Sequence, residues 1–382
     1  MKKELLRKNF MMLFLHDTLS YIHLKKDPVQ IPFGLSRFGF KSYLVVQKKE
    51  KIRVKNVKVF TLNKGFSEAF RSKFVIEKMF FEILSTIIVS LKLVSLLKKI
   101  KPKVIISYFY PFLFPFLKFF SFLSGSKMKI ICKLDWDGRV EGSNFKKISK
   151  KIGLFFVYIF SNKIIIESPG ARERAIDFSR FLDSKLIVVP NGVPSEFVKL
   201  IPKKIKRKKV ILCVASITRT KGIDLLLKAF SYLKNKHSEY QIRIVGPIID
   251  EKYYDELIKM CYELGIEKNV VFLGKISDKK LAQEYGNAEI FCLPSFIEGF
   301  PLSRVEALNA GLPMVTTSTG GCEIIKDAGI IVDIGDVKGL AKALEKIMND
   351  EKLRKEMSKN ARKIGKDYTW EKVCENLINK IK

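Results

Sequence analysis

Short apolar runs that alternate with helical stretches are the feature that most restricts how this 382-residue chain can fold. Such runs occupy 10–15, 43–47, 57–60, 104–107, 128–132 and 164–166 in the first half, and 210–216, 241–245, 270–276 and 290–293 in the second. Apolar runs this short are typical of strands buried on both faces of a parallel sheet. The pattern predicts an α/β protein with two Rossmann-like, doubly wound domains.

The length of the chain also favours two domains, because 382 residues exceed what one hydrophobic core usually organises. Residues 199–209 are polar and basic and contain Pro202, which suits a linker. We expect a first domain over 1–195, a second over 196–365, and a terminal helical segment over 366–382.

The positive charge is large and unevenly distributed. The formal net charge is +32, and residues 1–200 hold 38 Lys and Arg against 15 Asp and Glu, a net +23. A cationic half of this size is attracted to anionic surfaces, either nucleic acid or acidic lipid. No nucleic-acid-binding motif accompanies the charge. We therefore expect an anionic membrane surface as a partner and no nucleic acid, with solvated lysines that bind nothing as the alternative.

An aromatic run over 108–123 bears on the same question. Two prolines and Lys118 interrupt it, and it is shorter than the roughly 20 apolar residues that cross a bilayer. It predicts either a helix that lies in the membrane interface or a core helix packed on the sheet. Together with the charge, it favours peripheral attachment of the first half to the membrane.

Cysteine and histidine usage points to the cytoplasm and away from a metal. The six cysteines are widely spaced without a Cys-x-x-Cys pair, and the three histidines are not grouped with them. The N-terminal residues lack the apolar stretch of a signal peptide. We expect a cytoplasmic protein, peripheral at the inner face of the cell membrane, with no bound metal and no cofactor.

The stretch that follows the apolar run 290–293 places two carboxylates at one edge of the second sheet. A loop with proline and glycine separates this strand from a helix predicted over 302–309, so Glu298 lies in the loop and Glu306 in the helix. Loops at the carboxyl ends of parallel strands are where open α/β sheets bind ligands. The alternative is structural: Glu298 caps the helix and Glu306 lies on a solvated face.

The backbone at the start of this helix suits phosphate or another anion, because a helix start presents unpaired amides. The positions concerned are Gly299, Phe300, Pro301 and Leu302. A basic loop with Arg219 and Lys221 opens another helix after the strand at 210–216, and two cations there suit a diphosphate, although a solvated loop is the alternative. Gly246 ends the strand at 241–245, where the backbone can approach a ligand closely.

Polar residues also follow two strands of the first domain. Asp135 and Asp137 come after the strand at 128–132, and His16 ends the first strand. The carboxylates can orient the hydroxyl groups of a ligand from the same sheet edge, or they can form an Asp-rich turn with a structural role.

The motif around Glu298 resembles that of a known family. Glu-Gly-Phe-Pro, with Glu306 eight positions after Glu298, resembles the E-x7-E signature of retaining GT-B glycosyltransferases of family 4. The following Ala-Leu-Asn-Ala-Gly-Leu-Pro and Gly320-Gly321 continue the pattern, as does the Pro-Asn-Gly-Val turn at 190–193. The resemblance implies two Rossmann-like domains facing a cleft, with a terminal helix that crosses back to the first domain.

The resemblance also implies a hexosyltransferase that retains anomeric configuration without a metal. Glu298 would hold the donor sugar near its anomeric carbon, and Glu306 would bind ribose hydroxyls. Lys221 would neutralise the diphosphate, and the main-chain groups of Lys275 and Ile276 would contact the nucleotide base.

Three departures from the family pattern concern the same chemistry. The family's cleft histidine is missing, and Asp135 or Asp137 can take its place. The usual glycine-rich loop after the first strand is absent. Ser216 stands where the family has an arginine five residues before the lysine, so Arg219 is expected to supply that charge.

Taken together, we expect transfer of a sugar from a nucleotide diphosphate donor, a UDP-sugar ahead of a GDP-sugar, to a saccharide or lipid-linked acceptor. Cell-surface polysaccharide or glycolipid synthesis is the expected setting. The alternatives are a catalytically inactive GT-B-like membrane-associated subunit, a sugar-nucleotide epimerase of the same fold, and a basic nucleic-acid-binding protein.

Overall fold

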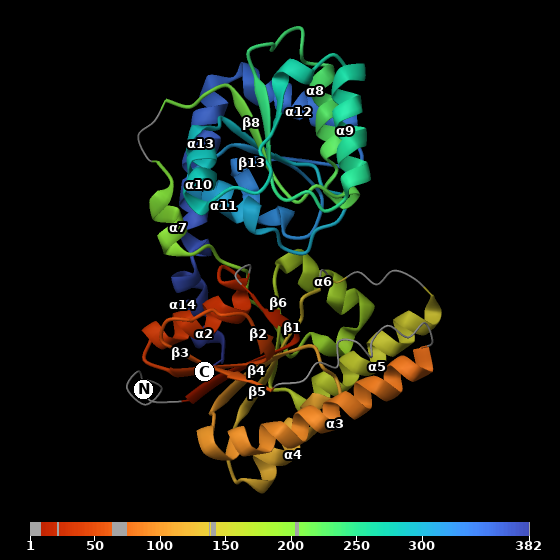
Figure 1. Cartoon of the computed structure of the whole chain (residues 1–382), viewed down its shortest axis with the longest axis vertical. Helices are drawn as coiled ribbons and strands as arrows, with labels where there is room; N and C mark the ends of the chain where they lie inside the picture. The colour runs from red at the N-terminus through yellow and green to blue at the C-terminus, as the bar shows by residue number, and fades with distance from the viewer. Residues whose placement is uncertain are drawn as a thin grey trace. The chain divides into compact units, whose positions relative to one another are not determined.

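The structure is a computed structural model that forms two compact units, Met1–Asn191 with Cys374–Lys382, and Gly192–Val373. It describes residues 9–20, 23–62, 75–136, 138, 143–202 and 206–381, with the backbone alone for 16–18 and 75–86. Figure 1 shows each unit as a sheet covered by helices.

Unit 1 contains a seven-stranded parallel sheet in the order β3-β2-β1-β4-β5-β6-β7. Its strands are β1 (Asn9–Leu19), β2 (Lys41–Lys49), β3 (Val57–Thr61), β4 (Val104–Tyr108), β5 (Lys129–Lys133), β6 (Lys163–Ile166) and β7 (Leu186–Val188). All five residues of β4 are buried, as expected for a central strand covered on both faces. The strand order doubles back between β1 and β4, so this is a doubly wound sheet.

The helices of unit 1 are α2 (Asp27–Arg37), α3 (Val75–Ile100), α4 (Leu113–Leu123), α5 (Asn144–Phe160), α6 (Pro169–Phe178) and most of α14 (Trp370–Ile381). One hydrophobic cluster joins α3, α4, α5 and α6 to the central strands. The chain end belongs to this unit: Lys129 Nζ donates to the carbonyl of Ile381 at 2.9 Å, and the Cys374 thiol lies near the carbonyl of Ile31 in α2.

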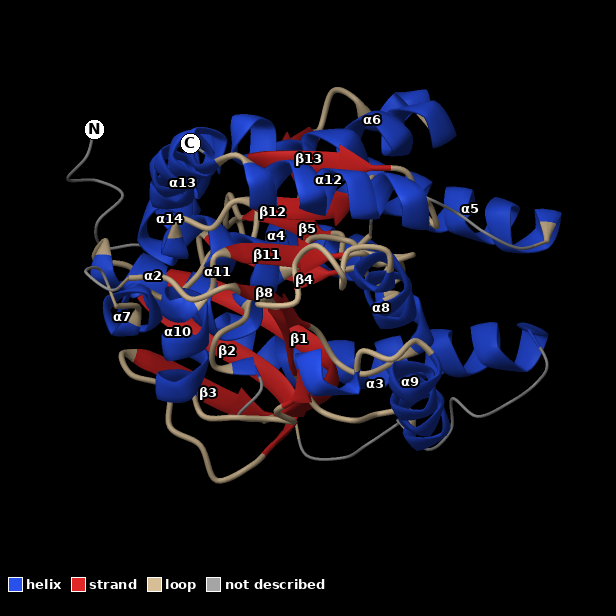
Figure 2. Cartoon of the chain, turned by 90° about the horizontal axis from the view of Figure 1, so that it is seen from above, coloured by secondary structure: helices blue, strands red, loops and turns tan. Residues whose placement is uncertain are grey.

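Unit 2 contains a six-stranded parallel sheet in the order β10-β9-β8-β11-β12-β13. The strands are β8 (Val210–Val214), β9 (Gln241–Val245), β10 (Val270–Phe272), β11 (Ile290–Leu293), β12 (Met314–Thr317) and β13 (Gly329–Val332). Figure 2 shows β8, β11, β12 and β13 side by side in this order. The sequence of strands again reverses, here between β8 and β11.

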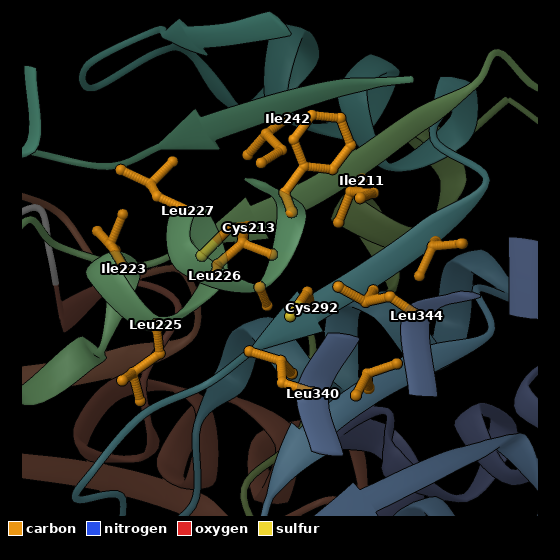
Figure 3. Close-up of a cluster of buried hydrophobic side chains, with 14 of the residues drawn as sticks. Ile211, Cys213, Ile223, Leu225, Leu226, Leu227, Ile242, Cys292, Leu340 and Leu344 are labelled. Carbon is orange, nitrogen blue, oxygen red and sulfur yellow. The ribbon is translucent and has the colours of Figure 1, made fainter. Parts of the chain in front are cut away.

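Two hydrophobic clusters cover the two faces of the second sheet, because successive strand residues point to opposite sides. Ile211 and Cys213 of β8 face the cluster drawn in Figure 3, which also takes side chains from α8 (Ile223–Ser231), α9 (Glu251–Glu263) and α12 (Val337–Asn349). Val210 and Leu212 face the other cluster, with α7 (Ser195–Leu200), α10 (Asp278–Asn287), α11 (Leu302–Ala310) and α13 (Glu351–Gly365).

Side-chain caps define where several helices of unit 2 begin. Each capping residue accepts a hydrogen bond from an amide in the first turn, which satisfies one of the unpaired donors there. The caps are Asp250 for α9, Ser277 for α10, Asp336 for α12 and Asp350 for α13.

The fold class predicted from the sequence, α/β with two Rossmann-like doubly wound sheets, is confirmed. The aromatic run forms the end of β4 and α4, whose Leu113, Phe114, Leu117 and Phe120 are buried in the core. Its outer side chains, Phe119, Phe122 and Leu123, are exposed. Among the described residues, no helix combines the length and apolar character needed to cross a bilayer.

Candidate active site

Three loops of unit 2 meet at the carboxyl edge of its sheet. They follow β8, β11 and β12, which are consecutive neighbours in the sheet and parallel to one another. The amide of Phe296 after β11 donates to the carbonyl of Thr220 after β8 at 2.8 Å. The amide of Gly320 after β12 donates to the carbonyl of Glu298 at 3.1 Å. Sheet order therefore brings these loops together although they lie far apart in the chain.

Glu298 and Lys221 form an ion pair at this edge. Lys221 Nζ lies 2.8 Å from Glu298 Oε1, and the buried Ser295 hydroxyl donates to the same oxygen at 2.8 Å. The Glu298 side chain is 8% exposed and that of Lys221 is 23% exposed. The structure thus joins two residues that the sequence placed in separate loops, and the edge of the site remains open to solvent on the lysine side.

Both structural alternatives for the paired glutamates are wrong. The helix α11 begins at the N-cap Pro301, and no side chain caps it, so Glu298 is not its cap. Glu306 is buried rather than solvated, and the Tyr285 hydroxyl donates to its Oε2 at 2.8 Å. Burial and the nearby Glu306 raise the pKa of Tyr285 well above its ordinary value. Tyr285 therefore stays a proton donor and orients the Glu306 carboxylate.

The predicted anion-binding backbone lies where expected, between Glu298 and the first turn of α11. Gly299, Pro301 and Leu302 are partly exposed, whereas Phe300 is buried and stacks on Tyr368 with ring centroids 6.2 Å apart. Phe300 thus anchors the loop, and the residues on either side of it are partly exposed.

Arg304 is a functional candidate that the sequence reading missed. Its side chain is fully buried, and its guanidinium donates to Gly320 O at 2.8 Å, Thr316 Oγ1 at 2.9 Å and Thr319 Oγ1 at 3.2 Å. Burial lowers the pKa of Arg304 to about 10, and the charge of Glu298 acts in the opposite direction. From the sequence, an arginine in a short helix is expected to lie in solvent. Only the burial of α11 on several sides shows that the Arg304 guanidinium is enclosed.

Gly320 is the contact point between Arg304 and the Glu298 loop. A Cβ at this position would lie 2.4 Å from the carbonyl oxygen of Glu298 and 2.3 Å from that of Gly299. Only glycine permits this approach, because any side chain would collide with backbone that cannot move independently. Arg304 therefore positions Glu298 through one shared glycine.

Arg219 does not join Lys221 and Glu298. Its guanidinium lies 2.6 Å from Glu256 Oε1 and 4.0 Å from Asp250 Oδ2, both at the α9 side of the loop. The hydrogen bond to Glu256 raises the pKa of this exposed arginine. Arg219 and Lys221 lie in one 3₁₀ turn, so their side chains leave the backbone in different directions.

The remaining donor-side candidates lie at the ends of β9 and β10, at the same edge of the sheet. Gly246 has a φ of 155°, and a Cβ there would lie 1.9 Å from the carbonyl oxygen of Ala215. This glycine is therefore required by the approach of the loop after β8. Lys275 is exposed and Ile276 partly buried, three and four residues after the end of β10.

The candidates of unit 1 are only partly visible. Asp135 follows β5 and is exposed. Asp137 lies outside the described residues. His16 belongs to β1, and its side chain is likewise not described.

A buried charge cluster in unit 1 also escaped the sequence reading. Lys133, at the end of β5, is 1% exposed and its Nζ lies 2.6 Å from Glu167 Oε1 and 3.1 Å from Asp27 Oδ2. Asn191 donates to Glu167 at 2.9 Å, and the Tyr108 hydroxyl donates to Asp27. Burial alone would lower the pKa of Lys133, but Asp27 and Glu167 outweigh it and raise that pKa. The sequence signal for this cluster was a lysine at the end of an apolar strand.

Comparison with known proteins shows what this chain resembles. Residues 196–364 match the family described as Glycosyl transferases group 1. An uncharacterised glycosyltransferase of Methanocaldococcus jannaschii is 28% identical over 280 residues, 67% of this chain and 71% of that protein. A Campylobacter jejuni α-1,4-N-acetyl-D-galactosaminyltransferase, whose name specifies an undecaprenol-diphosphate-linked glycan, is 32% identical over 181 residues, 46% of this chain and 48% of that protein.

The solved structure of Anabaena HepE in complex with UDP-glucose superimposes with a TM-score of 0.71 at 16% identity, covering 97% of this chain and 98% of that one. The shared fold and the family match over residues 196–364 support a GT-B glycosyltransferase of group 1, as the sequence resemblance implied. The retaining, family 4 part of that resemblance stays a prediction. The family match lies within unit 2, and for the whole chain the solved structures show the fold.

Proposed function

We propose that this glycosyltransferase is of the retaining, family 4 type and transfers a sugar from a nucleotide diphosphate donor to a saccharide or lipid-linked acceptor. The observation that carries the donor proposal is the Lys221–Glu298 pair beside the first turn of α11. A cation, a carboxylate and a helix start within one loop cluster match the diphosphate and the sugar of such a donor.

Lys221 and the backbone at the start of α11 bind the diphosphate. Negative charge on this leaving group grows as the glycosidic bond breaks, so fixed positive groups there lower the barrier. Arg304 adds a buried positive charge behind Gly320. Arg219 itself is held by Glu256 and Asp250 in the free protein.

Glu298 lies against the donor sugar, where a carboxylate favours a transition state with oxocarbenium character. The Ser295 hydroxyl and Lys221 hold one of its oxygens in place. Glu306 accepts hydrogen bonds from the ribose, with Tyr285 fixing its orientation. Lys275 and Ile276 offer main-chain groups to the base.

A UDP-sugar is the proposed donor, and HepE, which shares the fold, binds UDP-glucose. A lipid-linked acceptor fits the name of the Campylobacter relative. We place the protein in the cytoplasm, at the inner face of the cell membrane, in polysaccharide or glycolipid synthesis. The +23 charge of residues 1–200 supports an anionic surface as partner. On the acceptor side, exposed Asp135 is the described candidate, with Asp137 and His16 also proposed.

Thermal unfolding with UDP, GDP, ADP and CDP tests the donor proposal. A ligand at about 100 times its Kd adds about 2.7 kcal/mol to the folded state. We expect UDP to raise the unfolding temperature most. Glu345→Gln, which removes the Lys236–Glu345 ion pair of unit 2, should leave that shift unchanged. No shift with any nucleotide would contradict the donor site. A shift without turnover of UDP-sugars would instead support the inactive-subunit alternative.

A further inference from the structure

The helix α5 exposes a continuous apolar stripe. Its members recur at intervals of three and four residues, so they lie along one side of the helix. They are Phe145, Ile148, Ile152, Phe155 and Ile159, and each is between 46% and 57% exposed. The other side of α5, at Gly153, Leu154 and Val157, is buried against the core of unit 1. Core packing therefore accounts for one face of this helix and leaves the apolar stripe uncovered.

Neighbouring helices extend the same apolar surface. The helix α4 contacts both α3 and α5, and Figure 1 shows the three together at one side of unit 1. Phe119, Phe122 and Leu123 of α4 are 59%, 81% and 66% exposed, and Ile87 and Leu91 of α3 are 51% and 68% exposed. Most of the large apolar side chains that the described residues expose thus lie on these three helices. Concentrations of this kind mark interaction surfaces.

The charge around this surface is of one sign. Residues 87–100, 113–123 and 144–160 contain no aspartate or glutamate. Their lysines are Lys92, Lys98, Lys99, Lys118, Lys146, Lys147, Lys150 and Lys151. Lys150 is an exception among these lysines, because its ammonium lies 4.2 Å from the ring centroid of Phe109 and 4.9 Å from that of Trp136, two partly buried rings that pack on the core.

This combination selects an anionic lipid surface over a second copy of the chain. Lysine stems lie along apolar surface while their ammonium groups reach lipid phosphates. Two copies that joined their stripes would bring one set of lysines against another, without any acidic residue of 87–100, 113–123 or 144–160 to pair with them. The acidic residues of α3, Glu77 and Glu82, lie near its N-terminal end, before Ile87 and Leu91 in the sequence. An interfacial amphipathic helix has the same composition: an apolar face bordered by lysines.

We propose that unit 1 binds anionic membranes through the stripe of α5, supported by the exposed side chains of α3 and α4. The sequence left the aromatic run open between an interfacial helix and a core helix, and four side chains of α4 are buried in the core. The α5 stripe therefore carries most of the contact. This assignment rests on the proposed action at a membrane surface and names the residues that make the contact. Its test measures vesicle binding and does not depend on sugar transfer.

The test is flotation of the full chain with vesicles of phosphatidylcholine, alone or mixed with phosphatidylglycerol. We expect binding that increases with phosphatidylglycerol and weakens with salt. The variant I148S/I152S/F155S should reduce vesicle binding by roughly tenfold or more, because each serine removes apolar surface from the contact. The variant K146Q/K147Q/K151Q should bind less and lose its preference for phosphatidylglycerol.

The matched control is Y232S/I249S/Y262S, which removes three comparably exposed side chains from unit 2. It should bind vesicles as the unaltered chain does. Unaltered unfolding temperature and UDP-induced shift in all variants would show that fold and donor site are intact. If UDP does not raise the unfolding temperature of the unaltered chain, the proposed function is overturned. Vesicle binding by the same chain would still test the membrane assignment.

Three results would overturn the assignment. One is absence of binding to anionic vesicles by the unaltered chain. Another is an equal loss of binding in the unit 2 control. The third is self-association of the unaltered chain in solution that the I148S/I152S/F155S variant abolishes, while neither protein binds vesicles. That result would make the stripe a contact between copies of the chain.

Discussion

Lys221 Nζ lies 2.8 Å from Glu298 Oε1, an ion pair between loops that follow the neighbouring parallel strands β8 and β11. The two residues are 77 positions apart in the chain. In the free protein the lysine proposed for the diphosphate thus holds the carboxylate proposed for the sugar. Donor binding would place the anionic diphosphate beside a lysine that is already fixed in the site.

Replacing Glu298 with glutamine should reduce sugar transfer by about a hundredfold or more, because the neutral amide cannot stabilise positive charge that develops on the sugar. The unfolding temperature should change little, since glutamine keeps the shape and can still accept from Ser295. Steady-state transfer and thermal unfolding measure the two effects. Glu345→Gln, which also removes an ion pair, is the control. Near-normal turnover by the Glu298 variant would remove this residue from the mechanism.

Lys221→Gln should weaken UDP binding by about tenfold or more, since a hydrogen bond to a charged group contributes roughly 1.5–3 kcal/mol. Arg219→Gln should weaken it less, because Arg219 is occupied by Glu256 and Asp250. Titration calorimetry of both variants makes the comparison. Equal losses would mean that Arg219 leaves its acidic partners when the donor binds.

Arg304→Met should lower the free energy of unfolding by about 1–3 kcal/mol, because the carbonyl of Gly320 loses its buried donor. It should also weaken UDP binding, since the Gly320 contact positions Glu298. Arg304→Lys keeps the charge but cannot reach three acceptors in one plane. We expect it to recover part of the stability in denaturant unfolding. UDP affinity unchanged in both variants would limit Arg304 to a structural role.

Lys133→Met should lower the free energy of unfolding by about 3–5 kcal/mol, because it leaves Asp27 and Glu167 buried without their cation. Lys133→Met with Glu167→Gln and Asp27→Asn should recover much of this loss. Denaturant unfolding of the series makes the measurement, and a single variant as stable as the unaltered chain would contradict it.

The same lysine gives a prediction about pH. Its folded-state pKa is raised above the ordinary value of 10.5, so the stability it contributes is fully present below that pH and is lost only at higher pH. The difference in unfolding free energy between the unaltered chain and Lys133→Met should therefore not decline as the pH is raised from about 6 to about 9. A decline over this range would mean that Lys133 deprotonates in the folded state.

The sequence by itself determined the elements and the local part of the site. Strands and helices follow from the spacing of apolar residues, and this spacing is a property of neighbouring positions. Glu298 and the start of α11 belong to one strand-loop-helix segment, so their proximity required no knowledge of other elements. The family class followed from the same segment.

Only the tertiary structure decided which side chains are buried and which partners they meet. Arg219 looked like the second donor-site cation, but Glu256 of α9 and Asp250, the N-cap of α9, hold it elsewhere. Arg304 looked solvated, yet α11 lies beneath the loop after β12 and its guanidinium is enclosed. Lys133 meets Asp27 and Glu167 from two other elements, and α5 exposes a stripe that its periodicity alone would assign to a core. Burial and pairing depend on the order in which a sheet places distant segments side by side, and local sequence patterns do not encode that order.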